Sequence, residues 1–292
     1  MQVSKWGKIF LKKVIYCIAI RNYFLQSTHI SNLADTNIKD WTMNKYLFFI
    51  VWQIVFAVGI ANAQSINILS LNNSLIDYNN QPMMFNEMVK MMGKDAQWNA
   101  RTQLGRTLLY HYNDPVSRSL AMSGNWNYII LQEQSSLPKD YPEILMQSVM
   151  LWKRALLETS DDNVPTIILP MNWAYNDDWN HFKESSVKLK RSYRDVCREI
   201  PGIVICPIGL AYELLFDRKG AEVCSQLYTD NRHPSLKASY LASCMEYAVI
   251  FQESPLTITY VPQGLSETDA LAMRELAESA LSEWDKEMKT SR

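Results

Sequence analysis

The sequence has little glycine and proline for its length. Its 292 residues include 9 glycines and 11 prolines, spread without a low-complexity linker, an internal repeat or a glycine-rich phosphate-binding loop. A chain of this length with 48% hydrophobic residues can build one substantial domain, whereas a second full domain would be cramped.

An excess of charge is also missing. The formal net charge is -1, and no basic stripe with interleaved aromatic residues is present. A near-neutral balance gives no electrostatic reason to expect a nucleic-acid partner.

The five cysteines lack the C-x-x-C spacing of a zinc site, so we expect no metal. Cys17 lies outside the expected mature chain, described below. The remaining four could form disulfides in three pairings or remain buried free thiols, which we favour slightly. They are Cys197, Cys206, Cys224 and Cys244.

The segment that begins at Met43 has the pattern of a secretory signal peptide. Lys45 supplies a positive start, residues 46–60 an apolar stretch, and residues 61–63 (Ala-Asn-Ala) a small-x-small cleavage site. A short membrane anchor is the alternative, but the run is short and no basic stop-transfer cluster follows. We therefore expect a periplasmic or secreted protein with no stable membrane span after cleavage of residues 43–63.

Residues 1–42 do not fit in front of a signal peptide. They are basic, and their apolar patch at residues 14–20 is too short to span a bilayer. We expect them to be a gene-model extension, with translation starting at Met43. N-terminal sequencing of the exported protein should then begin near Gln64, and recovery of an intact Met1 would contradict this.

Short apolar runs alternate with helical periodicity over the rest of the chain, residues 64–292. Such runs are typical of parallel strands that are covered on both faces. Strands are expected at residues 66–71, 128–131, 166–170 and 203–206, with a weaker one at 97–101. The pattern predicts an α/β fold, a three-layer α/β/α sandwich with a parallel sheet, flavodoxin-like in arrangement.

Helices are expected between these strands. One runs from Pro82 to Met92 before Gly93, a favourable C-cap residue. Two further apolar stripes and a Ser266–Asp269 capping box indicate three more helices. The stripes are Leu145, Val149, Trp152, Leu156 and Leu189, Tyr193, Val196, Ile200.

Candidate catalytic side chains follow the first expected strand and precede the last helices. Ser74 lies in the turn after residues 66–71, where a serine usually only satisfies backbone groups. Asp230 and His233 are three residues apart before a helix expected near Ser235. A serine nucleophile needs an adjacent base, and that base needs a partner to fix its tautomer. Either motif alone is weak, since Asp230 could merely cap the helix.

Together these motifs resemble the SGNH/GDSL hydrolase superfamily, and especially a branch common in Bacteroidetes secreted proteins. Four blocks match in order over about residues 66–285: LNNSLIDYNN at 71–80, WNYIILQEQS at 126–135, the D-x-x-H-P-S at 230–235, and ASYLA at 238–242. The resemblance implies an ester hydrolase with Ser74 as nucleophile, His233 as general base and Asp230 as its orienting partner. A hydrolase of this kind needs no cofactor.

The resemblance also implies an oxyanion hole. Its donors would be the backbone N–H groups of Ser74 and Gly105 and a side-chain amide. Gln134 stands where the family usually has asparagine, although neighbouring Gln132 could serve instead.

Asn72 departs from the family pattern, which has glycine there. Asparagine tolerates the left-handed backbone region best among residues with side chains, but it adds a side chain beside the nucleophile. A catalytically degenerate, glycan-binding protein on the same fold is therefore the alternative function.

The loop at residues 171–179 bears on the substrate. Trp173 and Tyr175 with nearby amides and carboxylates suit the faces and hydroxyls of sugars, although both rings could equally pack under the loop. We expect a secreted serine esterase that removes acyl groups, acetyl above all, from small-molecule or glycan esters. A lipase acting on longer chains would need an apolar groove.

Overall fold

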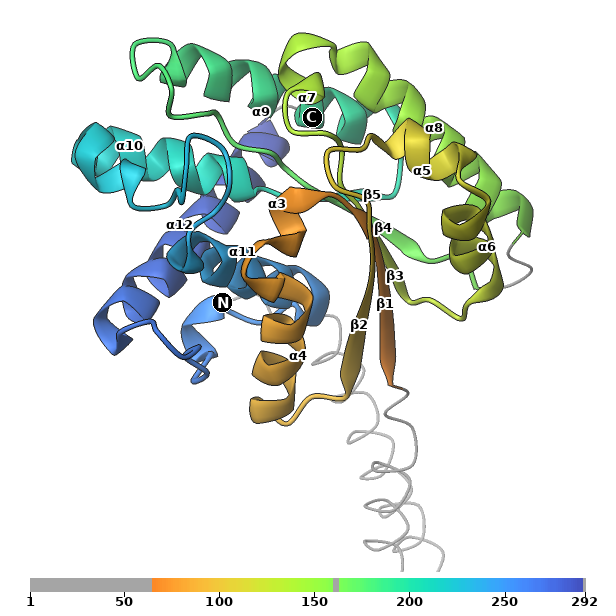
Figure 1. The fold of residues 1–292 in the computed structure, drawn as a ribbon, viewed down its shortest axis with the longest axis horizontal. Coiled ribbons are helices and arrows are strands. Elements are labelled where there is room, and N and C mark those ends of the chain that lie inside the picture. Colours follow the sequence, from red (N-terminus) through yellow and green to blue (C-terminus); the bar gives the residue numbers. More distant parts are fainter. Residues whose placement is uncertain (1–64, 160–162, 291–292) are drawn as a thin grey trace, which may run out of the picture. The chain divides into compact units, whose positions relative to one another are not determined.

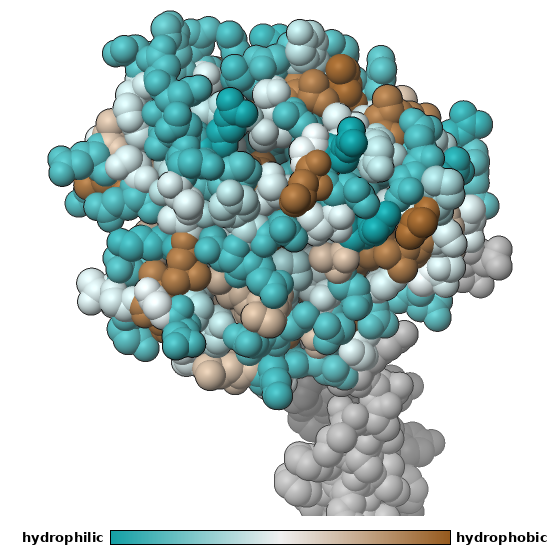
Figure 2. Space-filling view, in the orientation of Figure 1, coloured by the Kyte–Doolittle hydropathy of each residue, from teal (hydrophilic) through white to brown (hydrophobic). Residues whose placement is uncertain are grey.

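The computed structural model describes residues 65–159 and 163–290. The expected extension (1–42) and signal peptide (43–63) lie outside the described residues. Within the described ranges, no helix combines the length and apolar composition needed to cross a membrane. The face shown in Figure 2 is mainly hydrophilic, with hydrophobic side chains in separate groups.

A five-stranded sheet forms the centre of the fold, with strand order β2-β1-β3-β4-β5 and every pairing parallel. Ile68 of β1 is in register with Trp98 of β2 on one side and Tyr128 of β3 on the other. The strands are β1 (Ile66–Asn72), β2 (Ala96–Thr102), β3 (Tyr128–Leu131), β4 (Thr166–Pro170) and β5 (Ile203–Cys206). The expected strands are thus confirmed.

Helices cover both faces of this sheet (Figure 1), which confirms the α/β/α sandwich. On one side α4 and α11 pack together, with α12 against α11, and on the other α5, α8 and α9 follow one another. The helices are α3 (Ser74–Asp77), η1 (Tyr78–Asn80), α4 (Gln81–Met91), α5 (Leu108–Asn113), α6 (Pro115–Ser123), α7 (Leu137–Asp140), α8 (Pro142–Thr159), α9 (Phe182–Glu199), α10 (Ile208–Ser225), α11 (Leu236–Phe251), η2 (Pro255–Thr257) and α12 (Glu267–Thr290).

The helices form where their sequence signals place them. Gly93, just beyond α4, has φ 66°, a left-handed conformation that glycine adopts without strain. Ser266 Oγ accepts a hydrogen bond from the Asp269 N–H at the start of α12. Both apolar stripes are buried, which removes them from water and joins α8 and α9 to the core.

All four described cysteines are free thiols, in agreement with the favoured expectation. Cys206, Cys224 and Cys244 are buried. Burial raises the pKa of the Cys224 and Cys244 thiols to about 12 and that of Cys197 to about 11. These thiols are therefore protonated at neutral pH.

The strand order places a topological switch between β1 and β3. The chain leaves β1 through α4 on one face and reaches β3 through α5 and α6 on the other. Open α/β sheets bind ligands at the carboxyl ends of the strands that flank such a switch. Residues after Asn72 and after Leu131 therefore meet where a site is expected.

Candidate active site

The turn after β1 presents Ser74 at the sheet edge. Asn73 caps α3, because its Oδ1 accepts a hydrogen bond of 3.2 Å from the Leu75 N–H. Ser74 is the first residue of α3, so its own N–H has no acceptor within the helix. The cap therefore holds the backbone of this half-buried serine and leaves its N–H free of helical bonding.

A short closed loop presents His233. A bridge pairs Tyr228 with Pro234, and the Thr229 N–H donates to the His233 carbonyl at 2.9 Å. Ser235, rather than Asp230, caps the following helix α11. The carboxylate of Asp230 is thus available to the histidine.

The structure brings Ser74, His233 and Asp230 into one hydrogen-bonded chain. Ser74 Oγ lies 3.0 Å from His233 Nε2, and His233 Nδ1 lies 2.8 Å from Asp230 Oδ2. The other carboxylate oxygen of Asp230 accepts from the N–H groups of Arg232 and His233 at 2.7 and 2.8 Å. Partial desolvation opposes ionisation, but these hydrogen bonds outweigh it and hold the pKa of Asp230 at about 2. An ionised Asp230 places the proton on Nδ1 and leaves the Nε2 lone pair facing the Ser74 hydroxyl.

Gly105 lies in an exposed turn after β2. The Arg106 N–H donates to the Gln103 carbonyl at 3.1 Å, and Gly105 has φ 67°. This left-handed conformation explains why glycine occupies the position. The Asn73 side-chain amide reaches the Arg106 carbonyl at 3.4 Å, which links this turn to the serine turn.

Both candidate glutamines follow β3, but they have different surroundings. The Gln134 amide oxygen accepts hydrogen bonds from the Ser136 N–H, the Ser136 hydroxyl and the Leu137 N–H. This cap fixes the side chain and leaves its NH₂ group as the remaining donor. Gln132 is only 2% exposed, and its amide oxygen lies 3.4 Å from the Asn73 N–H.

A buried network lies behind the serine turn and is not evident from the sequence. The Asn73 amide donates to the Glu133 carbonyl at 3.1 Å, and the Asn172 amide donates to the same carbonyl at 3.3 Å. The Glu133 carboxylate accepts from the Leu108 and Gln134 N–H groups at 3.1 and 2.7 Å. Burial raises the pKa of Glu133 above its ordinary value. Polar residues directly after buried strands were the available signal, because such groups need partners when buried.

Asn72 does not adopt the left-handed conformation considered from its sequence. It ends β1 in register with Thr102, and positive φ among described non-glycine residues occurs only at Asn79, Asn80 and Gln252. Its side chain accepts from the Ser70 hydroxyl at 2.8 Å and donates to the Thr102 hydroxyl at 2.9 Å. The side chain is therefore committed to the sheet, which explains why this turn does not require glycine.

His111 supports the same turn from beneath. This fully buried histidine donates from Nε2 to the Asn72 carbonyl at 3.1 Å, and its Nδ1 lies 2.9 Å from the Ser117 hydroxyl. Burial lowers the pKa of His111, which favours the neutral ring.

The two aromatic residues of loop 171–179 differ. Trp173 is 5% exposed, stacks on Tyr212 at 4.8 Å between ring centroids, and donates to the Arg232 carbonyl. The ring therefore packs under the loop against Tyr212, but the residue also lines the cavity described below, so its substrate contact stays a prediction. Tyr175 is half-buried, with its hydroxyl 2.5 Å from Ser135 Oγ and the Arg232 guanidinium 5.0 Å from its ring centre.

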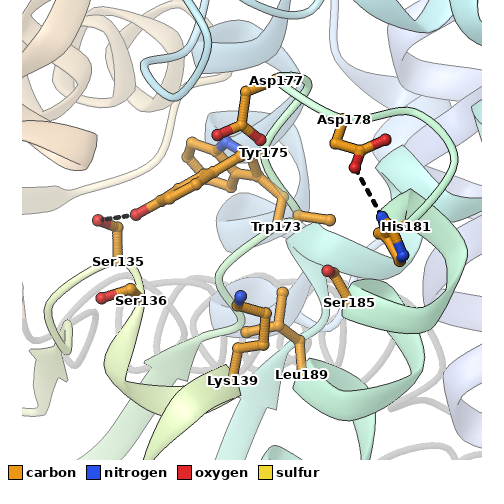
Figure 3. A pocket seen from close by; sticks show the side chains of 11 residues that line it. Ser135, Ser136, Lys139, Trp173, Tyr175, Asp177, Asp178, His181, Ser185 and Leu189 are labelled. Carbon is orange, nitrogen blue, oxygen red and sulfur yellow. Dashed lines mark hydrogen bonds and ion pairs between the residues drawn. The ribbon is translucent and has the colours of Figure 1, made fainter.

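Tyr175 lines a cavity of about 180 Å³ beside the carboxyl ends of β3 and β4 (Figure 3). Lys139 and Ser185 lie on the opposite side of the cavity from Tyr175. Asp178 Oδ2 lies 2.6 Å from His181 Nδ1. The polar lining consists of Ser135, Ser136, Lys139, Tyr175, Asp177, Asp178, His181 and Ser185. Among the described residues, no cluster of three or more His, Cys, Asp or Glu side chains could hold a metal.

Comparison with known proteins gives similarity at the level of structure. No family model matches the sequence, and no curated protein is similar enough to be matched. A DUF4886 family protein from Bacteroides uniformis superposes with a TM-score of 0.64 at 15% identity, covering 75% of this chain and 95% of that one. A proposed SGNH hydrolase from Slackia heliotrinireducens gives 0.54 at 20% identity, covering 64% and 100%. At such identities the likeness concerns the fold alone. This chain has the fold of the SGNH hydrolases.

Proposed function

We propose that the protein is a serine esterase, exported to the periplasm or beyond the cell, that removes short acyl groups from carbohydrate esters. The hydrogen-bonded chain of Ser74, His233 and Asp230 at the β1/β3 switch is the observation that carries the proposal. The SGNH-hydrolase fold supports ester hydrolysis as the class of reaction.

Acylation begins at Ser74. Its Oγ attacks the ester carbonyl carbon while the hydroxyl proton passes to His233 Nε2, 3.0 Å away. Asp230 stabilises the resulting imidazolium through Nδ1–H. When the tetrahedral intermediate collapses, the C–O bond to the alcohol breaks, and His233 returns the proton to the departing oxygen.

Deacylation repeats these steps with water. His233 takes a proton from the water, whose oxygen attacks the Ser74 acyl ester. The Ser74 Oγ–carbon bond then breaks, and the proton on His233 returns to Ser74. The cycle releases one carboxylic acid and consumes no cofactor.

The oxyanion receives hydrogen bonds from the Ser74 and Gly105 N–H groups and from one glutamine amide. The N–H of Ser74 is free of helical bonding, and the hydrogen bond from the Asn73 amide to Arg106 ties the Gly105 turn to it. We favour Gln134 as the amide donor, because its cap leaves only the NH₂ group to bond. Fixed donors of this kind accelerate acyl transfer by about 10²–10³-fold each.

The cavity lined by Tyr175 and Lys139 receives the alcohol part of the substrate. Its hydroxyl, amine and carboxylate groups match the hydrogen-bonding groups of a sugar. Tyr175 lies beneath Arg232, the residue before His233, and this contact supports a substrate position that reaches from the cavity to the reacting groups.

Hydrolysis of p-nitrophenyl acetate by the purified protein tests the proposal. Ser74→Ala should abolish turnover, whereas Ser279→Ala, whose hydroxyl bonds only within α12, should retain it. Equal rates for wild type and Ser74→Ala would rule out the serine mechanism. Saturable glycan binding without turnover would favour the binding-protein alternative.

Substrate class is tested separately. Lys139→Ala should raise KM for an acetylated oligosaccharide and leave p-nitrophenyl acetate hydrolysis unchanged. Rates that increase from acetyl to octanoyl esters would instead indicate a lipase.

Export has its own test. The proposal requires that residues 43–63 act as a signal peptide and are removed. Fractionation of the producing cell should then recover a protein that begins near Gln64, and a cytoplasmic protein retaining Met43 would contradict export.

A further inference from the structure

Tyr78 lies flat against the imidazole of His233. The ring centroids are 4.2 Å apart with an interplanar angle of 8°. Tyr78 follows α3, the short helix that begins with Ser74, so one continuous segment supplies both the hydroxyl facing Nε2 and the ring covering the imidazole face. This contact is not explained by packing of the core, because Tyr78 is only half-buried.

The backbone after Tyr78 is held in an uncommon conformation. Asn79 and Asn80 have φ of 57° and 48°, in the left-handed region that asparagine tolerates better than most residues. The Asn79 amide donates to the Pro234 carbonyl at 3.1 Å and to the Ser239 hydroxyl at 2.9 Å. These bonds fasten the Tyr78 turn to the residue directly after His233 and to α11.

Asp230 alone does not fix the imidazole plane. Its carboxylate binds Nδ1, and rotation about that hydrogen bond would carry Nε2 away from Ser74. A parallel ring against one face opposes such rotation. The negative face of an aromatic ring also attracts a cation, so the contact strengthens when His233 holds a proton.

We propose that Tyr78 is a positioning residue, held by Asn79, that keeps His233 Nε2 directed at Ser74 in both protonation states of the ring. The inference rests on the proposed esterase function. Among the described residues, the titratable groups that contact the imidazole are Asp230 from the histidine loop and Tyr78 from η1. The nearby Arg232 guanidinium lies over Tyr175 instead.

Three tyrosine variants test the kinetic consequence with p-nitrophenyl acetate. Tyr78→Leu should lower kcat about tenfold or more with KM changed less than twofold, and Tyr78→Phe should restore most of kcat. Tyr141→Leu makes the same chemical change at a tyrosine that is 54% exposed and should match wild type.

The pH profile separates positioning from a structural role. Without the ring, the imidazolium loses a favourable contact, so the acid limb of kcat/KM should move to lower pH in Tyr78→Leu. Tyr78→Phe should keep the wild-type limb. A Tyr78→Leu enzyme with wild-type kcat and limb would overturn the proposal, as would equal defects in Tyr78→Phe and Tyr78→Leu.

Asn79→Gly tests the anchor. Glycine keeps the left-handed backbone accessible but removes both side-chain hydrogen bonds. We expect kcat to fall about threefold to tenfold, in the same direction as Tyr78→Leu, and wild-type kcat would remove Asn79 from the proposal.

A spectroscopic readout keeps the inference testable if the protein does not hydrolyse esters. The sequence has four histidines, so ¹³C-histidine labelling with His233→Gln for assignment resolves the His233 ring protons by NMR. The stacked Tyr78 ring should shift them upfield, an effect kept in Tyr78→Phe and lost in Tyr78→Leu. If the upfield shift is present but no ester is hydrolysed, the esterase proposal is refuted and the positioning role of Tyr78 is not. Identical His233 resonances in wild type, Tyr78→Phe and Tyr78→Leu would refute the positioning role.

Discussion

Ser74 Oγ lies 3.0 Å from His233 Nε2, although 159 positions separate these residues. The contact forms because each residue occupies a loop at the same edge of the parallel sheet. The Asn73 cap fixes one partner, and the Tyr228–Pro234 bridge fixes the other. Folding of the whole domain therefore determines the geometry, and the predictions below concern the groups that maintain it.

Removing the partner of His233 should reduce turnover strongly while the fold persists. Asp230→Asn leaves a neutral amide opposite Nδ1 and favours the wrong imidazole tautomer. We expect kcat/KM for p-nitrophenyl acetate to fall by about 10³–10⁴-fold. Circular dichroism should be unchanged, since the Asp230 side chain is 51% exposed. Activity within tenfold of wild type would show that the carboxylate does not orient the base.

The two glutamines after β3 can be separated by isosteric substitution. Gln134→Glu keeps an oxygen for the Ser136 and Leu137 donors but replaces the NH₂ group with a second carboxylate oxygen. If Gln134 is the oxyanion donor, kcat should fall by about 10²–10³-fold with little change in thermal stability. Gln132→Glu is the matched comparison, and a larger kinetic loss there would assign the role to Gln132.

Replacing Asn72 with glycine, the residue of the SGNH/GDSL pattern at this position, should cost stability and gain no activity. The substitution leaves the buried Ser70 hydroxyl without the acceptor that it has at 2.8 Å and removes the bond to Thr102. Leaving a buried polar group unpaired costs about 1–3 kcal/mol. Urea unfolding should show this loss for Asn72→Gly. A variant with wild-type stability or increased kcat would contradict the role given to this side chain.

Glu246 should make stability decrease as pH rises. It is fully buried on α11, with Oε2 accepting from the Gln81 amide at 2.7 Å, and burial raises its pKa from 4.5 to about 8. Between these values the folded protein keeps a proton that the unfolded chain releases. The stability contributed by this group is therefore complete below pH 4.5 and is lost as pH rises toward 8, by at most roughly 1.4 kcal/mol per pH unit.

Glu246→Gln removes this titration and keeps the acceptor for Gln81. The melting temperatures of the two proteins should diverge as pH rises from about 5 to 9, with the variant more stable at the alkaline end. Parallel curves would show that Glu246 does not titrate over this range.

The sheet could be predicted from the sequence because strands buried on both faces leave unbroken apolar runs. The expected bounds of β3, β4 and β5 match the structure. The edge strand β2 gave a weaker signal because only Trp98 is buried along it. The order of strands and the closeness of Ser74 to His233 followed from resemblance and the rules for parallel sheets rather than from local pattern.

The parts of the site that could not be predicted depend on contacts between distant segments. Nothing near Trp173 indicates that Tyr212 would stack on it, and nothing near Asn72 shows that Ser70 and Thr102 would hold its amide. Tyr78 likewise gains its place only when the α3 segment meets the His233 loop. Such side chains reveal their roles once the tertiary fold defines their partners.

Covalent labelling by a fluorophosphonate tests the central claim most directly, because the reagent marks a serine hydroxyl activated by a neighbouring base. The account predicts one label per chain, located by peptide mass spectrometry on Ser74, absent in Ser74→Ala and strongly slowed in His233→Ala. Labelling of another serine, or equal labelling of wild type and His233→Ala, would contradict it.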